Sequence, residues 1–234
     1  MVSRVRYLIW IRAILFDLHN TLVYKKDNVE FEEVSKYLFS KDYEISSQQF
    51  EAAWSFVSFI DYPKYGYKDW RSYLSRIFWR LNVKVDDKTL DQVIELFEST
   101  PYRLHPDAAE AVVKAKKHRF KTAIVTTIAH FKFEKAIEPI RNYIDFVMTG
   151  YEAGVDKSNP KMYLKVLEIL NVEPCEAVMI GDEMLLDVLL PKRLGINAIL
   201  LDREGINKAG AVDAFVYNLN ATMDFILSHR RKRW

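Results

Sequence analysis

The sequence predicts an α/β protein, a doubly wound parallel sheet that carries an inserted all-helical segment. Five short apolar runs predict the strands: AILF at 13–16, TAIVT at 122–126, DFVM at 145–148, AVMI at 177–180 and AILL at 198–201. Amphipathic helical patterns separate the last four runs, and this alternation is typical of parallel strands covered by helices on both faces. The interval between the first and second runs is too long for one crossover connection and predicts the insertion.

The interval from residue 28 to residue 102 predicts a small helical bundle. Apolar residues recur there at the three- and four-residue spacing of one helix face. The matching positions are Phe50, Ala53, Trp54 and Val57; Trp70, Tyr73, Leu74, Ile77, Phe78 and Leu81; and Leu90, Val93, Ile94 and Phe97. Asp86 or Asp87 is expected to cap the last of these helices. We therefore expect an α/β core domain formed by residues 1–27 and 103–234, and a helical domain formed by residues 28–102.

The many aromatic side chains of the insertion first predict a hydrophobic core, because aromatic residues at helical spacing usually pack inside. Tyr62, Tyr65 and Tyr67, in the stretch DYPKYGYKDW, are expected in a loop and remain candidates for lining a substrate pocket.

Composition excludes several classes of partner. The chain has 234 residues with 34 basic and 32 acidic side chains, so no overall field favours nucleic acid or an anionic membrane. The apolar stretch from Tyr7 to Phe16 is interrupted by Arg12 and is too short to span a bilayer. The single cysteine, Cys175, cannot form an intramolecular disulfide, which favours a reducing, cytoplasmic location.

Polar side chains follow the predicted strands where each strand ends. Because ligands of open parallel sheets bind at the carboxyl ends of the strands, we expect these side chains to converge. They are Asp17, Thr126, Thr127, Lys157, Asp182 and Asp187. Ser158 or Asn159 is expected to cap the helix that follows Lys157.

This set of groups indicates phosphate chemistry. Carboxylates that face one another repel, so their pKa values rise or a hard cation lies between them, and oxygen ligands suit Mg²⁺. A hydroxyl and an ammonium can hold the remaining phosphoryl oxygens of a substrate. Asp17 could attack phosphorus and form an aspartyl-phosphate that water then cleaves. Each residue alone has an ordinary structural explanation, but their order on successive strands is specific.

The chain resembles the haloacid dehalogenase (HAD) superfamily. The stretch FDLHNTL at 16–22 resembles its first motif, and IVTT at 124–127 resembles the second. Lys157 with Pro160 is similar to the third motif, and IGDEMLLD at 180–187 to the fourth. The insertion at 28–102 falls where the first type of cap domain of that family belongs. The resemblance therefore implies a hydrolase with a Rossmann-like core and a helical cap.

The resemblance also implies roles for individual residues. Asp17 would be the nucleophile and a metal ligand, with the backbone carbonyl of His19 and the carboxylate of Asp182 as further ligands of Mg²⁺. Asp187 would either hold the metal ligands in place without binding the metal directly, or position Lys157.

For the substrate, the resemblance implies a small phosphorylated molecule. Thr126, with Thr127 beside it, would hold the phosphate, and Lys157 would neutralise the phosphate and the nucleophile together.

His19 departs from the family pattern, because the phosphatases usually carry a second Asp there that protonates the leaving oxygen and then activates water. A histidine of ordinary pKa, ~6.5, can in principle do both. Its protonated form is disfavoured beside a divalent cation, so slow turnover of alkyl phosphates and better turnover of aryl or acyl phosphates are expected. Alternatively, His19 only fills space or hydrogen-bonds the turn. His105 and His130 could also reach the site, although surface or helix-cap roles are favoured for both.

Three functions remain open. The first is a Mg²⁺-dependent phosphatase of a small metabolite. The second is another hydrolase of the superfamily, either a haloacid dehalogenase or a phosphonoacetaldehyde hydrolase with Lys64 or Lys68 as its Schiff-base lysine. The third is a phosphate- or partner-binding protein that has lost turnover. The retained acidic and basic residues favour the first, and the acidic fourth motif argues against the metal-free dehalogenases.

Overall fold

The computed structural model describes residues 10–205 and 214–229 and contains a six-stranded sheet of order β5-β4-β1-β6-β7-β8. Each neighbouring pair of strands is parallel. The strands are β1 (Ala13–Phe16), β4 (Lys121–Val125), β5 (Phe146–Met148), β6 (Ala177–Gly181), β7 (Asn197–Leu201) and β8 (Ala214–Val216). The predicted α/β class is confirmed. Strand order reverses at β1, which lies between β4 and β6, so a ligand site is expected where β1 ends.

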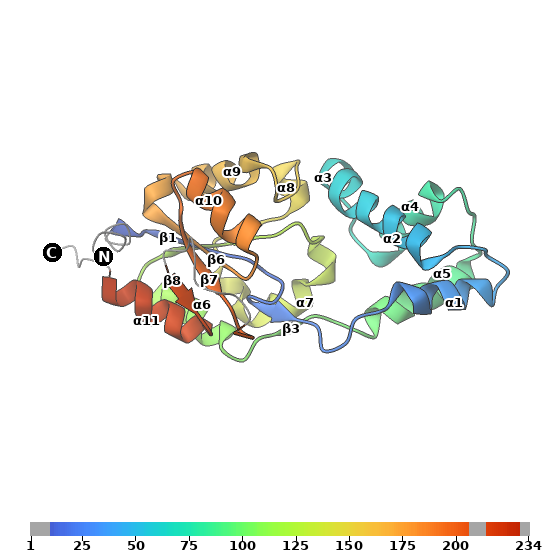
Figure 1. The fold of residues 1–234 in the computed structure, drawn as a ribbon, viewed down its shortest axis with the longest axis horizontal. Coiled ribbons are helices and arrows are strands. Elements are labelled where there is room, and N and C mark those ends of the chain that lie inside the picture. The colour runs from blue at the N-terminus through green and yellow to red at the C-terminus, as the bar shows by residue number, and fades with distance from the viewer. Residues whose placement is uncertain (1–9, 206–213, 230–234) are drawn as a thin grey trace.

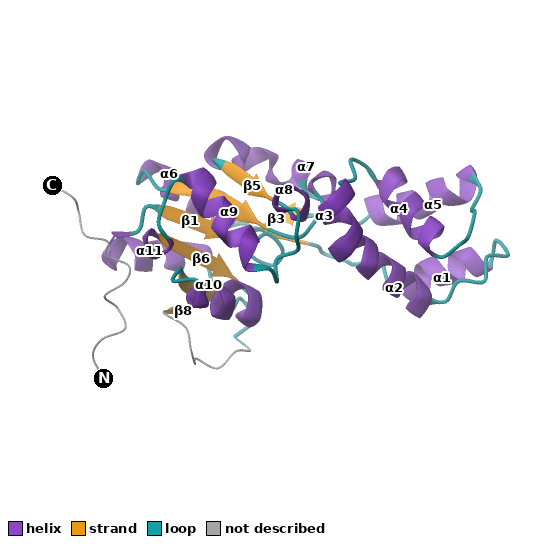
Figure 2. Ribbon diagram, turned by 90° about the horizontal axis from the view of Figure 1, so that it is seen from above, coloured by secondary structure: helices purple, strands orange, loops and turns teal. Residues whose placement is uncertain are grey.

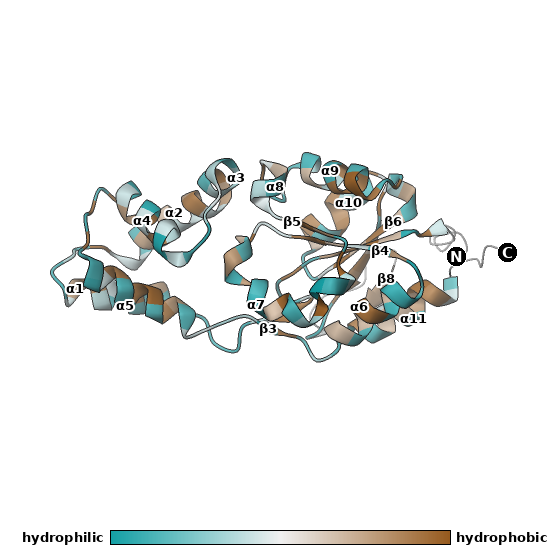
Figure 3. Cartoon of the chain, turned by 180° about the vertical axis from the view of Figure 1, so that it is seen from behind, coloured by the Kyte–Doolittle hydropathy of each residue, from teal (hydrophilic) through white to brown (hydrophobic). Residues whose placement is uncertain are grey.

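Helices cover both faces of the sheet (Figure 1). On one face lie α6 (Ala108–Lys117) and α11 (Leu219–His229), and on the other lie α9 (Pro160–Leu170) and α10 (Leu190–Arg193). Successive side chains of a strand point to opposite faces of the sheet, and β1 shows this. Ile14 and Phe16 pack in the same hydrophobic cluster as the apolar side of α6, whereas Ala13 and Leu15 pack in the same cluster as that of α9. Figure 3 shows the corresponding concentration of hydrophobic residues along the strands.

Short helical segments complete the core. They are the 3₁₀ turns His130–Lys132, Glu138–Tyr143 and Pro174–Glu176, the helices α7 (Glu134–Ile137) and α8 (Gly150–Ala153), and a π-helical turn at Met184–Leu189.

The insertion consists of helices that share a buried apolar cluster of their own. They are α1 (Phe31–Phe39), α2 (Ser47–Phe56), a π-helical turn at Val57–Asp61, α3 (Tyr62–Tyr65), α4 (Trp70–Arg80) and α5 (Asp87–Glu98). Ser46 and Gln49 form a capping box at α2, and the Asp86 carboxylate caps α5 by accepting a hydrogen bond from the Thr89 N–H at 2.9 Å. Figure 2 shows these helices set apart from the sheet.

An antiparallel ribbon of β2 (Val23–Tyr24) and β3 (Arg103–Leu104) joins the insertion to the sheet, so the chain enters and leaves side by side. Neither this ribbon nor β8 is predicted by the sequence.

The expected loop position of Tyr62 and Tyr65 is wrong. The chain continues from α2 through the π-helical turn into α3, and Pro63 in its first turn is compatible with a helix start. Tyr62 is buried, and only Tyr67 of the three tyrosines lies outside a helix.

No helix among residues 10–205 and 214–229 is long and apolar enough to cross a membrane. Of the apolar stretch 7–16, residues 7–9 lie outside the described residues.

Candidate active site

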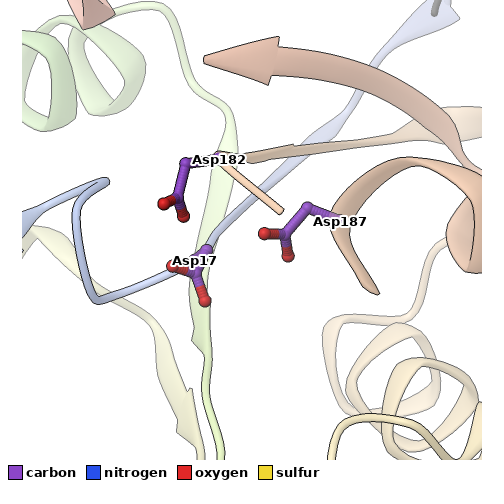
Figure 4. A group of neighbouring side chains, drawn as sticks. All are labelled: Asp17, Asp182 and Asp187. Carbon is purple, nitrogen blue, oxygen red and sulfur yellow. The ribbon is translucent and has the colours of Figure 1, made fainter. Parts of the chain in front are cut away.

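Three aspartates from two neighbouring strand ends meet at the edge of the sheet (Figure 4). Asp17 follows β1, and its N–H donates to the carbonyl of Ile180 in β6 at 2.8 Å. Asp182 follows β6, and Asp187 lies in the π-helical turn just after it. One carboxylate oxygen from each of the three lies within 4.8 Å of the others. The predicted convergence of these carboxylates is therefore present.

Lys157 lies among these acids. Its ammonium forms an ion pair with Asp17 and a second one with Asp187, at 2.6 Å. Only 4% of its surface is exposed. Lys157 lies in the loop just before α9. Asn159, rather than Ser158, caps that helix by accepting a hydrogen bond from the Lys161 N–H at 3.0 Å, so the chain is fixed two residues after the lysine.

The electrostatics show a surplus of buried negative charge. Burial raises the pKa of Asp17, although the neighbouring Lys157 opposes the shift. Burial also raises the pKa of Asp187, to about 6. Burial followed by the charge of Asp187 raises the pKa of Asp182. Burial alone would lower the pKa of Lys157, but Asp17 and Asp187 outweigh it and raise that pKa. One ammonium thus faces three carboxylates.

The residues present fit a hard divalent cation. The oxygens of Asp17, Asp182 and Asp187 are the ligand type that Mg²⁺ prefers, and a cation between them would offset their repulsion. Gly181 makes this clustering possible: a Cβ built there would lie 2.2 Å from the Cγ of Asp187, so any side chain would displace that carboxylate.

The two threonines predicted to bind phosphate follow β4. Thr126 is buried, and its hydroxyl oxygen accepts from the Ile128 N–H at 3.2 Å. Thr127 is partly exposed and lines a cavity between the sheet and the insertion.

The ring of His19 lines the same cavity and meets Tyr102 edge-on, with centroids 5.7 Å apart. Burial lowers the pKa of His19, the charge of Asp182 raises it, and the charge of Lys25 lowers it further. The net direction is downward, which favours a neutral imidazole. The next residue, Asn20, has a left-handed backbone with φ of 56°.

The other two candidate histidines, His105 and His130, do not line this cavity. His105 packs against Tyr24 with tilted rings, 4.7 Å between centroids, and lines a separate hollow that Asp182 also lines. Burial lowers its pKa to about 4. His130 lies 3.5 Å from the Glu134 carboxylate on α7, one helical turn on.

Lys64 and Lys68, the candidate Schiff-base lysines, are both exposed and do not line the cavity beside His19.

The sequence did not point to the lysines that do line this cavity, Lys25 and Lys132. Lys132 follows the second motif by only a few residues, in HFKFEK, where a lysine between two phenylalanines is the only local signal.

Comparison with known proteins agrees with the geometry. Residues 11–195 match the family of haloacid dehalogenase-like hydrolases. The chain is similar to a glyceraldehyde 3-phosphate phosphatase of Pyrococcus furiosus, with 24% identity over 81% of this chain and 80% of the relative.

Two solved structures share the fold. They are a HAD phosphatase from Thermococcus onnurineus (TM-score 0.63, 24% identity, 95% of this chain and 100% of that one) and a 2-haloacid dehalogenase from Pseudomonas syringae pv. Tomato (TM-score 0.69, 16% identity, 93% and 99%). The matched region covers all the residues gathered around Lys157, from Asp17 to Asp187. The chain therefore belongs to the haloacid dehalogenase-like hydrolases.

Proposed function

We propose that this hydrolase is a Mg²⁺-dependent phosphatase of a small phosphorylated metabolite and works through an aspartyl-phosphate at Asp17. The observation that carries the proposal is the buried Lys157, paired with Asp17 and Asp187 while Asp182 lies within the same group of oxygens. The similarity to a glyceraldehyde 3-phosphate phosphatase supports the reaction class.

In the first step, a carboxylate oxygen of Asp17 attacks phosphorus, and the bond to the ester oxygen breaks. The electron pair goes to the leaving oxygen, which takes up a proton. Lys157 and the Thr126 hydroxyl hold the phosphoryl oxygens as charge builds on them. In the second step, water attacks phosphorus, the bond to Asp17 breaks, and inorganic phosphate leaves with the carboxylate restored.

The metal ligands proposed are the carboxylates of Asp17 and Asp182 and the backbone carbonyl of His19, with Asp187 holding Lys157 in place. A bound Mg²⁺ would supply further neutralisation of the phosphoryl charge. His19 is the proposed acid and base, positioned at the cavity wall.

We further propose that residues 28–102 form a cap domain on a core of residues 1–27 and 103–234. The cap would exclude water from the reaction, as lids do in other hydrolases. The contact between α3 and α8 supports this role: the Tyr62 hydroxyl lies 2.8 Å from that of Thr149 and accepts a hydrogen bond from the His130 N–H.

The test is phosphate release from acetyl phosphate and p-nitrophenyl phosphate, with Mg²⁺ or with EDTA. We expect release that requires Mg²⁺ and disappears in Asp17→Asn. Asp224→Asn, which removes an exposed carboxylate on α11, serves as the matched control and should retain activity. Release that persists in Asp17→Asn, or that EDTA leaves unchanged, would contradict the proposal.

A further inference from the structure

A cavity of about 360 Å³ extends from the candidate active site into the insertion. His19 and Thr127 line it on the side of the sheet, next to Asp17 and Thr126. Aromatic residues of the insertion, including Trp54 and Tyr73, line it on the other side. A molecule whose phosphate reaches Asp17 would therefore place the rest of its body in this cavity.

The ammonium of Lys132 lies in the aromatic part of the cavity. Its Nζ is 3.7 Å from the ring centroid of Tyr73, 4.1 Å from that of Trp54 and 5.0 Å from that of Trp70. The faces of aromatic rings attract a cation, so this cage can hold the charged form of the lysine. Rings do not accept the three N–H donors of an ammonium as well as oxygen atoms do.

A second ammonium, that of Lys25, reaches the cavity from the end of the β2 strand. Its Nζ lies 5.1 Å from the ring centroid of Tyr102 and donates to the Thr100 hydroxyl at 3.5 Å. Two lysine ammonium groups thus line one cavity.

Among the described residues, no acidic side chain pairs with either of these lysines. The cavity lining contains no Asp or Glu. Burial, and then the charge of Lys25, lower the pKa of Lys132 well below its usual range. Lys132 is partly buried. A cation that has lost part of its hydration and has no counter-ion is costly, and an anion bound beside it would reduce that cost.

We propose that Lys132, with Lys25, binds a second anionic group of the substrate, so that the substrate is a phosphate ester carrying a carboxylate or another phosphate. The aromatic walls fit an apolar or flat body between the two anions. This inference rests on the proposed phosphatase function, because it takes the first phosphate to lie at Asp17.

The experiment measures binding rather than turnover, by calorimetry in the presence of Mg²⁺. Three non-hydrolysable probes are compared: 4-carboxybenzylphosphonate, 1,4-xylylenebisphosphonate and the neutral isostere 4-carbamoylbenzylphosphonate. The two anionic probes separate carboxylate from phosphate recognition. We expect at least one of them to bind at least about tenfold more tightly than the amide, the size of one charge-assisted hydrogen bond.

The variants assign that preference to the lysine. In Lys132→Met, which keeps an unbranched apolar chain in the cage, the ratio of dissociation constants should fall towards one. Lys132→Arg should restore a preference for the anion. Lys135→Met, which removes an exposed lysine on α7, is the matched control and should keep the wild-type ratio.

Equal affinity of the wild-type protein for all three probes would overturn the inference, as would a preference that survives in Lys132→Met. A loss of affinity for every probe alike in Lys132→Met would also overturn it, because the lysine would then only join the insertion to the core. These outcomes are distinct from a failure of the proposed function, which would show as absent phosphate release while the preference for the anionic probe persists.

Discussion

At the scale of single residues, the histidine in the first motif sets the reactivity expected of this site. His19 is partly buried beside Tyr102, and its surroundings lower its pKa. At neutral pH the ring is therefore mainly neutral and can accept a proton but donates one poorly. This favours the second half of the proposed reaction, in which water is activated, over the first, in which the leaving group needs a proton.

His19→Asp is expected to accelerate the hydrolysis of alkyl phosphates. A general acid contributes ~10²- to 10⁴-fold to such reactions, and poor leaving groups gain most from it. The measurement is kcat for a series of phosphate esters of increasing leaving-group pKa, which should show a weaker dependence on that pKa in the variant. An unchanged dependence, with no gain on alkyl esters, would contradict the account of His19 as a poorer general acid than aspartate.

Gly181→Ala is expected to disrupt the acidic group. The added methyl would overlap the side chain of Asp187, so the aspartate and its partner Lys157 must move. Overpacking of this kind costs ~1–3 kcal/mol of unfolding free energy, and phosphate release should be lost as well. Urea unfolding and an activity assay measure the two effects.

Gly154→Ala is the matched control for this substitution. Its methyl would meet nothing within 4 Å, so only the backbone φ of +73° disfavours alanine there, and this variant should keep its activity even if it loses some stability. An alanine at 181 that leaves both stability and activity at wild-type levels would refute the close approach of Asp187.

At the scale of elements, the strands that pair in the middle of the sheet were predictable because buried parallel strands are continuous apolar runs. The strands β2 and β3, with two residues each, are too short to leave a pattern. Asp17, Asp182 and Lys157 were predictable because they follow successive strands. The cage around Lys132 was not, because its rings come from α2 and α4, more than fifty positions earlier in the chain, and meet the lysine only through tertiary packing.

A partly buried ion pair joins three elements of the core and gives a prediction for pH. The two terminal guanidinium nitrogens of Arg203 donate to the Asp107 carboxylate, at 2.9 and 3.0 Å, and the Leu219 N–H donates to it at 2.8 Å. Burial alone would raise the pKa of Asp107, but these donors outweigh it and lower that pKa. The stabilisation is thus present above the unfolded-state value, ~3.9, and is lost as the pH falls through the lower folded-state pKa.

Asp107→Asn should therefore destabilise the protein near neutral pH, and the difference from wild type should shrink as the pH falls below about 4. Urea unfolding midpoints at several pH values measure this. Asp224→Asn, which removes an exposed carboxylate, is the control. Asp145→Asn would not serve, because the pKa of Asp145 is also lowered in the folded protein. A constant difference between wild type and Asp107→Asn at all pH values would contradict the role of the charge.

At the scale of the whole molecule, the insertion lies at the carboxyl edge of the sheet, and two of its contacts with the rest of the chain flank the cavity. One is the hydroxyl pair of Tyr62 and Thr149 between α3 and α8. The other is the pair Phe131 and Lys132, which enters the aromatic cluster of the insertion. Between these contacts lies the cavity that opens beside Asp17. The arrangement supports the two proposed roles: residues at the sheet edge carry out phosphoryl transfer, and side chains of the insertion bind the rest of the substrate.

The central claim, that Asp17 becomes phosphorylated, is tested most directly by borohydride reduction during turnover. An aspartyl-phosphate is reduced to homoserine, which peptide mass analysis locates in the sequence. With acetyl phosphate and Mg²⁺ we predict homoserine at position 17, and none with EDTA or in Asp17→Asn. Phosphate release without any change at position 17, or homoserine at another aspartate, would contradict the account.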